Sequence, residues 1–568
     1  MAFRFSASLA ALAAGVLLAS PAMAQTTSTD QAEIGQSVDD SSLYADFLAA
    51  RAALLAGDRV YASERMAEAA DSLPESAFLR ERAFTAALFS GDISTAARLA
   101  PAANPEIPPL EGLGRLTQAV ERYAVGDAQG SVDKLAGEPI LFPHSTAAHL
   151  FRPWALAAAG RWDEALKQET APDRIAELFD MLNRAQLLEL RKRPDDAEAL
   201  YKALVEDRIA ATLFRPMYGE FLERRGRRDE AIRVYDEGLA QQPGDEALAA
   251  GRSRAQRRGR PPAPVTLQEG AANALGYAAA AMNAQRQSEL SVAYLRLSLR
   301  LHPTQDEAWV LVGDQLAKGD EGAGAREAWG HIGPESGYFS ETRAKVIYSL
   351  HRDGETAAAL ALADETVRVH PRDLRARLTL ADMLRVSERH EDAAVVLSEV
   401  IKAGDVGWKP YFMRGVAYDR LDRWAEAEAD LQKALEIAPE EPEVLNYLGY
   451  AWIDRGTRVA EGLALVERAV AARPDSGAMQ DSLGWAHYRK GDYAEAVTVL
   501  EKAVRMSPAD PEINEHLGDA YWRVGRRDEA QFQWRRVLTL NPGATVRTRA
   551  EQKLKEGLPP PPPAAPRT

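Results

Sequence analysis

A fixed spacing of glycine and proline constrains the fold of this chain more than any other feature of its sequence. In the first half the successive glycines Gly57, Gly91, Gly126 and Gly160 stand at intervals of 34, 35 and 34 along the chain. In the second half two intervals of 68 are followed by intervals of 35, 34 and 34, read from Pro303, Pro371, Pro439, Pro474, Pro508 and Pro542. Such a period indicates a stack of one supersecondary unit, each copy contacting only its neighbours. A stack also accounts for 568 residues, more than one hydrophobic core can organise.

The unit at residues 477–510 shows why this period arises. Its first helix carries Leu483 and Gly484, and Gly491 allows the turn that follows. Its second helix has one small apolar face at helical spacing, formed by Ala496, Leu500 and Ala503. We therefore predict an all-α chain of roughly 13 or 14 antiparallel helix pairs.

The same frame recurs in other units. One further copy reads Leu517-Gly518, Tyr521, Gly525, Ala530, Trp534 and Pro542. These residues resemble the consensus of the tetratricopeptide repeat (TPR), closely from 408 to 544, fairly from 306 to 407, and in degenerate form from 43 to 245. The resemblance implies a right-handed superhelical solenoid with a concave inner face and a convex outer face.

The register of the repeat breaks once. The interval from Pro243 to Pro303 is 60 instead of 68, and a proline-rich stretch falls between them. We therefore predict two sub-solenoids divided there. The expected segments are a signal peptide at 1–24, a flexible lead-in at 25–40, a degenerate array at 41–250, an Arg/Pro-rich break at 251–267, a second array at 268–544, a capping helix at 545–557 and a Pro-rich tail at 558–568.

The N-terminal segment 1–24 has the layout of an export signal. Arg4 is its only charged residue, an apolar run extends from Leu9 to Ser20, and Ala22 and Ala24 are the small residues that signal peptidase requires. We predict cleavage after Ala24 and a periplasmic mature protein, with an uncleaved N-terminal anchor as the alternative. The chain has no cysteine, which excludes disulfides, thiolate metal sites and a lipidated N-terminal Cys. Any association with the outer membrane is therefore expected to go through a partner.

Charge and motifs argue against several functions. The net charge of −15 repels phosphate backbones, so nucleic acid is not an expected partner. No phosphate-binding glycine loop, paired-histidine metal motif or nucleophile elbow is present, and His516 is an isolated histidine. We predict no catalytic residues, no metal and no cofactor.

One basic cluster stands out in this acidic chain. Five arginines fall close together, namely Arg252, Arg254, Arg257, Arg258 and Arg260. They fit a solvated helix end, where the helix dipole also favours cations. The alternative is a docking patch for an acidic partner or for lipid phosphates.

Positions 5, 9, 12 and 13 of each first helix form a stripe that the TPR resemblance implies lines the concave groove. In the last three repeats this stripe combines amides and carboxylates, which can hold a peptide backbone, with large aromatics, which supply contact area. The predicted partner-binding stripe is Asn446, Tyr450, Asp481, Trp485, Tyr488, Arg489, Glu515, Asp519, Trp522 and Arg523. The alternative is that Tyr450, Trp485 and Trp522 only fill gaps between successive first helices.

The block from Asn446 to Val537 is similar to that of exported TPR proteins of Gram-negative bacteria. Some of these are outer-membrane lipoproteins, and one type joins a carboxyl-terminal processing protease to cell-wall hydrolases. The resemblance implies a periplasmic adaptor that binds envelope proteins or peptide segments. A scaffold for polysaccharide export or cell-wall assembly is a second hypothesis. An enzyme with a site in the degenerate N-terminal half is a third.

Overall fold

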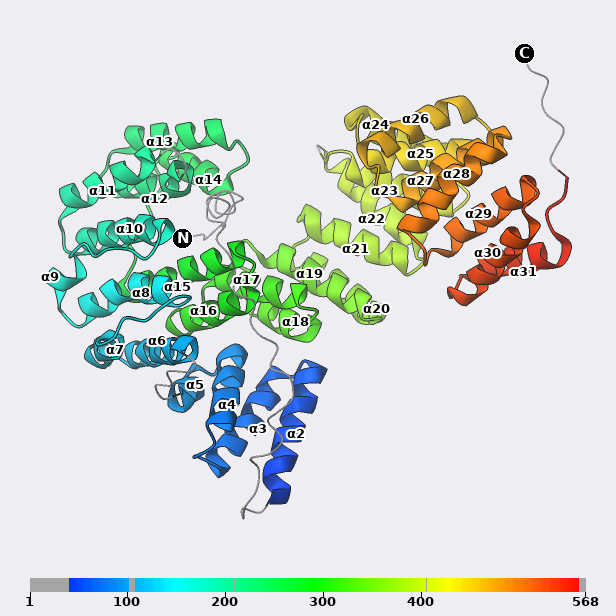
Figure 1. Ribbon diagram of the computed structural model, residues 1–568. Coiled ribbons are helices and arrows are strands. Elements are labelled where there is room, and N and C mark those ends of the chain that lie inside the picture. The colour runs from blue at the N-terminus through cyan, green and yellow to red at the C-terminus, as the bar shows by residue number, and fades with distance from the viewer. Residues whose placement is uncertain (1–39, 102–107, 208–209, 405, 561–568) are drawn as a thin grey trace. The chain divides into compact units, whose positions relative to one another are not determined.

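All regular secondary structure in the described residues is helical. The computed structural model describes residues 40–101, 108–207, 210–404 and 406–560, which hold 30 helices and no strand (Figure 1). Thirty helices make at most 15 pairs, close to the 13 or 14 predicted, and the all-α solenoid is confirmed. The signal peptide, most of the lead-in and residues 561–568 of the tail lie outside the described residues. The chain forms two compact units, Met1–Ser349 and Leu350–Thr568.

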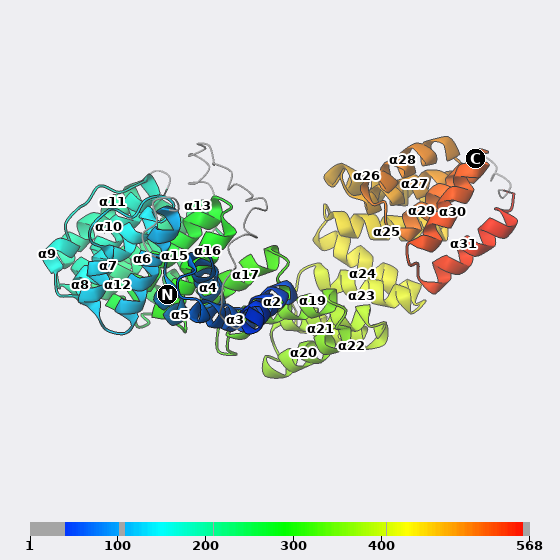
Figure 2. The ribbon, with the colours of Figure 1, turned by 60° about the horizontal axis from the view of Figure 1, so that its bottom comes forward.

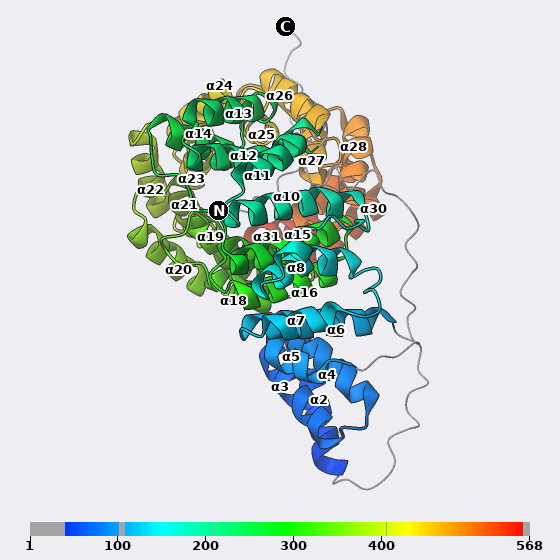
Figure 3. The ribbon, with the colours of Figure 1, turned by 90° about the vertical axis from the view of Figure 1, so that its left-hand side faces the viewer.

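Unit 1 contains the N-terminal helices of the chain and ends within α19. Its helices are α2 (Asp40–Ala56), α3 (Arg59–Ser72), α4 (Ala77–Ser90), α5 (Ile93–Leu99), α6 (Pro108–Ala124), α7 (Ala128–Leu135), α8 (Ser145–Ala158), α9 (Trp162–Ala165), α10 (Arg174–Leu190), α11 (Pro194–Glu206), α12 (Ala211–Arg224), α13 (Arg228–Gln241), α14 (Glu246–Gln256), α15 (Leu267–Ala284), α16 (Ser288–Leu301), α17 (Asp306–Lys318), α18 (Gly322–Gly330) and α19 (Phe339–Arg352). Figure 3 shows α2 to α5 continuing the stack of α6 and α7.

Helices α15 and α16 form the interior of unit 1. Every residue from Gly270 to Met282 is buried, as expected for a helix with small or apolar side chains on all faces. The pair packs against α4, α6, α8 and α10, the first helices of four successive pairs (Figures 1 and 2). A Cβ atom on Gly270 would lie 2.1 Å from the ring of Trp154, so the contact between α15 and α8 needs glycine there. The inner face of these first helices is therefore covered by the chain itself.

This packing differs from the division expected at residues 251–267. Residues 257–266 do leave the helical frame, and α15 begins afresh with a capping box between Thr266 and Glu269. The chain beyond the break nevertheless returns to α8 and α10, where the ring of Tyr277 stacks on Phe179 at 4.1 Å. The division between compact units lies between Ser349 and Leu350 instead.

Unit 2 follows the repeat frame closely. Its helices after α19 are α20 (Thr356–Val369), α21 (Leu374–Val386), α22 (His390–Lys402), α23 (Lys409–Arg420), α24 (Trp424–Ile437), α25 (Pro442–Arg455), α26 (Val459–Ala472), α27 (Gly477–Lys490), α28 (Tyr493–Met506), α29 (Pro511–Arg523), α30 (Arg527–Thr539) and α31 (Ala544–Glu556). The face of α28 formed by Ala496, Leu500 and Ala503 is fully buried. A Cβ on Gly484 would lie 2.5 Å from Leu500, which is why α27 needs glycine at this contact.

Candidate partner-binding site

The structure brings the predicted stripe together on α25, α27 and α29, the first helices of three successive pairs in unit 2. Contacts between neighbouring first helices show this. The indole N–H of Trp485 donates to Asp454 Oδ1 at 3.2 Å, and the Arg523 guanidinium donates to the Tyr488 hydroxyl at 3.1 Å. Arg489 pairs with Asp454 at 3.3 Å at the exposed margin.

A buried ion pair occupies the middle of the stripe. His516 Nδ1 lies 3.0 Å from both carboxylate oxygens of Asp481, and both side chains are buried. Burial alone lowers the pKa of His516, but the charge and hydrogen bond of Asp481, helped by Glu512 and Asp519, raise it to about 9. His516 is therefore an imidazolium at neutral pH, and it has a structural partner that the sequence did not indicate.

The aromatic residues of the stripe lie between first helices. The ring of Trp485 stacks on Tyr488 at 4.7 Å and on the His516 imidazole at 4.2 Å. Tyr450 is half-buried, and desolvation raises the pKa of its phenol. Trp485 therefore packs between first helices, as the packing alternative expects, and Tyr450, Trp485 and Tyr488 all remain partly exposed.

The last repeat is covered by α31. Arg549 donates to Glu515 at 2.6 Å, and the Lys553 ammonium bridges Glu515 and Asp519 at 2.7 Å each. Burial pushes the pKa of Glu515 upward, but Arg549 and Lys553 outweigh it and hold this pKa below its usual value. Desolvation raises the pKa of Asp519 despite Lys553. The Glu515 side chain is only 1% exposed.

Residues after α31 extend this cover. Gly557 lies against the ring of Trp522, where a Cβ atom would approach to 2.0 Å, and Arg523 donates to the Pro559 carbonyl at 2.5 Å. Glu515, Asp519, Trp522 and Arg523 were expected to line an open groove, and the structure places them under the chain's own C-terminal segment. The physical reason is charge: α31 carries cations where α29 carries carboxylates.

The open part of the stripe lies on α25 and α27. Asn446 has a buried Oδ1 that accepts no hydrogen bond from any described residue. Tyr450 and the edge of Trp485 are partly exposed, and Arg489 is exposed. We call Asn446, Tyr450, Trp485 and Arg489 the open stripe. It offers a partly exposed amide residue, two aromatic surfaces and a cation.

Two aromatic contacts extend this face toward the N-terminus and were missed from the sequence. Phe412 of α23 stands at the same offset as Asn446 and packs edge-on against Tyr447 at 5.7 Å. Trp408 packs against Phe412 at 5.9 Å. The signal for Phe412 was its position one repeat period before Asn446.

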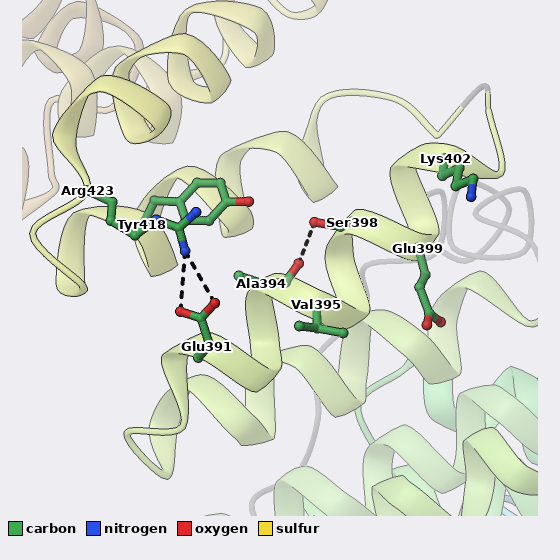
Figure 4. A pocket seen from close by; sticks show the side chains of 8 residues that line it. All are labelled: Glu391, Ala394, Val395, Ser398, Glu399, Lys402, Tyr418 and Arg423. Atoms are coloured by element: carbon green, nitrogen blue, oxygen red, sulfur yellow. Dashed lines mark hydrogen bonds and ion pairs between the residues drawn. The ribbon is translucent and has the colours of Figure 1, made fainter.

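A separate hollow of about 270 Å³ lies on α22, beside the end of α23 (Figure 4). Arg423 lies over the Tyr418 ring at 4.5 Å and donates to Glu391 at 3.3 Å. Val395, 54% exposed, forms part of its wall. No residue of the predicted stripe lines this hollow. Its side chains include no nucleophile–base pair.

The arginine cluster divides into two groups. Arg252 pairs with Asp236 at 2.6 Å, and Arg254 pairs with the buried Glu223 at 2.6 Å, so both hold α14 against the preceding helices. Arg257, Arg258 and Arg260 are exposed.

Over the residues described, no group of three or more His, Asp or Glu side chains is placed to hold a metal ion. In the same residues no helix has the length and apolar character needed to cross a bilayer.

Comparisons with known proteins agree with this architecture. A TPR repeat model matches residues 484–525, and tetratricopeptide repeat models match 408–441, 348–406 and 219–247. The TPR repeat-containing protein PA4667 of Pseudomonas aeruginosa is 31% identical over 116 residues, which are 20% of each chain. The chloroplastic protein SLOW GREEN 1 of Arabidopsis thaliana is 32% identical over 94 residues, 16% of this chain and 29% of that one. The chain thus matches less than a third of either relative's length.

Solved structures similar to this chain include the Cut9 and Hcn1 hetero-tetramer of the APC/C. The match has 16% identity and a TM-score of 0.41, and it covers 91% of this chain and 96% of that one. A tetratricopeptide repeat protein from Parabacteroides merdae has 15% identity, 44% and 97% coverage, and a TM-score of 0.37. The stacked helix pairs and their recurring stripe define the class, a helical-repeat solenoid. The family matches then specify the repeat: this chain contains tetratricopeptide repeats.

Proposed function

We propose that this chain is a periplasmic protein-binding scaffold that holds a peptide segment or a protein partner on the open stripe of unit 2. The proposal rests on which first helices have a face that no other helix of the chain covers. In unit 1 the inner faces of α4, α6, α8 and α10 are covered by α15 and α16, and in the last repeat the face of α29 is covered by α31. The aromatic and amide groups of α25 and α27 remain partly exposed.

The chemistry of the open stripe favours an extended peptide. Asn446 lies on the same face and is partly exposed, and amide side chains can hydrogen-bond a peptide backbone. Tyr450 and Trp485 offer flat surface to an apolar side chain of the partner. The Asp454–Arg489 pair at the margin suits a polar rim around that contact.

In the cell this scaffold acts as an adaptor that recruits an envelope protease or a cell-wall enzyme. The export layout of residues 1–24 and the similarity of residues 446–537 to exported TPR proteins of Gram-negative bacteria, one type of which is an adaptor, support this role. The alternative function is a scaffold subunit of a polysaccharide-export or cell-wall assembly machine, and the same features support it.

The test is site-specific crosslinking in envelope extracts. A photoreactive residue at position 450 should capture a discrete partner, and the same residue at position 532 should not, because exposed Phe532 lies on the second helix α30. Adding Trp485→Ala, which removes the larger aromatic surface of the open stripe, should reduce capture at position 450. Removal of one central interface group commonly weakens binding by roughly thirtyfold. Equal capture at both positions would refute the proposed site.

A further inference from the structure

Three turns of unit 1 concentrate cationic side chains at one edge. They follow α10, α12 and α14, and each contains a residue in the left-handed backbone region, at Lys192, Gly226 and Arg258, with φ of 57°, 78° and 55°. We call their cations the basic edge: Arg191, Lys192, Arg193, Arg224, Arg225, Arg227, Arg228, Arg257, Arg258 and Arg260. All of them except Lys192 are arginine.

The three turns lie side by side. Arg225 of the second turn lies 3.7 Å from Asp195, just after the first turn. Arg224 donates to the Pro262 carbonyl of the third at 3.5 Å and pairs with Glu189 at the end of α10 at 2.6 Å. The cations therefore form a continuous row across the ends of three helices.

Part of this row has no counter-charge. Four members are paired with carboxylates: Arg193 with Asp196, Arg224 with Glu189, Arg225 with Asp195, and Arg227 with Glu198 and Glu230. Within the described segments, no carboxylate lies within 4.0 Å of the charged groups of Arg228, Arg257, Arg258 or Arg260. Residues 247–268 contain five arginines and no acidic residue, in a chain with a net charge of −15. The excess positive charge is therefore local.

We propose that the basic edge docks unit 1 on an anionic phospholipid surface, with its guanidinium groups binding lipid phosphates. Arginine's planar fork of donors matches phosphate oxygens, and a row across helix ends can reach a flat surface together. A protein partner would need apolar anchors at the centre of the contact. Of the described side chains, no exposed large hydrophobic one lies between residues 143 and 347, so this surface has charge without such an anchor.

The test is sedimentation of the full chain with vesicles at about 0.1 M salt. Vesicles of phosphatidylethanolamine with about a third phosphatidylglycerol should bind it, and vesicles of phosphatidylcholine alone should not. Each cation near an anionic surface strengthens binding roughly fivefold, so the triple variant Arg257→Gln, Arg258→Asn, Arg260→Gln should bind about 125-fold more weakly. Asparagine is used at 258 because it tolerates the left-handed backbone.

The matched control removes three exposed cations of unit 2, Arg372→Gln, Arg505→Gln and Lys555→Gln, and so makes the same change in net charge. It should bind vesicles as the wild type does, and both variants should keep the wild-type melting temperature. Equal loss in the two variants would show that net charge alone matters and would overturn the proposal. So would binding to poly-glutamate with no binding to phosphatidylglycerol vesicles, which would assign the edge to an acidic protein.

Discussion

The ammonium of Lys553 should be the main support of the C-terminal end of the solenoid. It contacts Glu515 and Asp519 at 2.7 Å each, and these carboxylates are almost fully buried. Lys553→Met keeps the aliphatic stem and removes the charge. Leaving buried carboxylates without their cation costs about 3 kcal/mol, the lower part of the range for broken buried pairs, because Arg549 remains on Glu515 and the Trp534 N–H remains on Asp519.

The effect should be confined to the last repeats, because each repeat contacts only its neighbours. Hydrogen exchange of the full chain should show amide protection in α29 to α31 reduced about 150-fold, which is about 3 kcal/mol at about 1.36 kcal/mol per decade. Protection in α21 to α25 should stay unchanged. A global melt would dilute the effect, so exchange is the better assay.

Lys555→Met is the matched control. It removes an exposed cation slightly further along the same helix, for which the described residues show no ion pair. It should leave exchange in α29 to α31 within a few-fold of the wild type. If Lys553→Met and Lys555→Met behave alike, burial of the carboxylates does not depend on Lys553 and the reasoning fails.

Three further outcomes are expected. The pKa of His516, about 9, lies above that of a free imidazole, so its contribution to the stability of the folded protein is complete below about pH 6.5 and is lost as pH rises through 9. The melting temperature of the wild type should fall over that window. The fall should be much smaller for His516→Gln. Residues 350–560 should fold alone with high helicity by circular dichroism, whereas residues 268–556 should expose α15 and bind a hydrophobic dye. N-terminal sequencing of protein from periplasmic extracts should begin at Gln25, and recovery of the Met1 form would contradict export with cleavage.

The pairing of helices could be predicted from the sequence because close contacts restrict residue size. Gly484 leaves no room for a Cβ against Leu500, and the buried face of α28 is held by small residues at helical spacing. These constraints recur at a fixed period, so the frame and the stripe positions were predictable. The period says nothing about which later helix covers a face.

Two packing contacts determine which first-helix faces are covered by the chain itself. The run from Gly270 to Met282 has no polar face, which signals burial on all sides, but only the structure shows that α8 and α10 cover it. The cover over the last repeat was readable: Arg549 and Lys553 stand one repeat period after Glu515 and Asp519, with the charge reversed. A repeat that reverses charge at equivalent positions predicts that neighbouring copies neutralise each other.

The same criterion separates binding surface from packing within each unit. In unit 1 most charged side chains of α12 to α14 form ion pairs within the unit, such as Arg254 with Glu223. The turns of the basic edge, by contrast, keep cations with no carboxylate within 4.0 Å. In unit 2 the carboxylates of α29 meet cations of α31, while Tyr450 of α25 and Trp485 of α27 stay partly exposed. Groups that the chain does not satisfy itself are the ones whose free energy a partner can recover. Unit 1 therefore has an unpaired charged edge suited to a charged surface, and unit 2 has a partly exposed polar and aromatic stripe suited to a peptide.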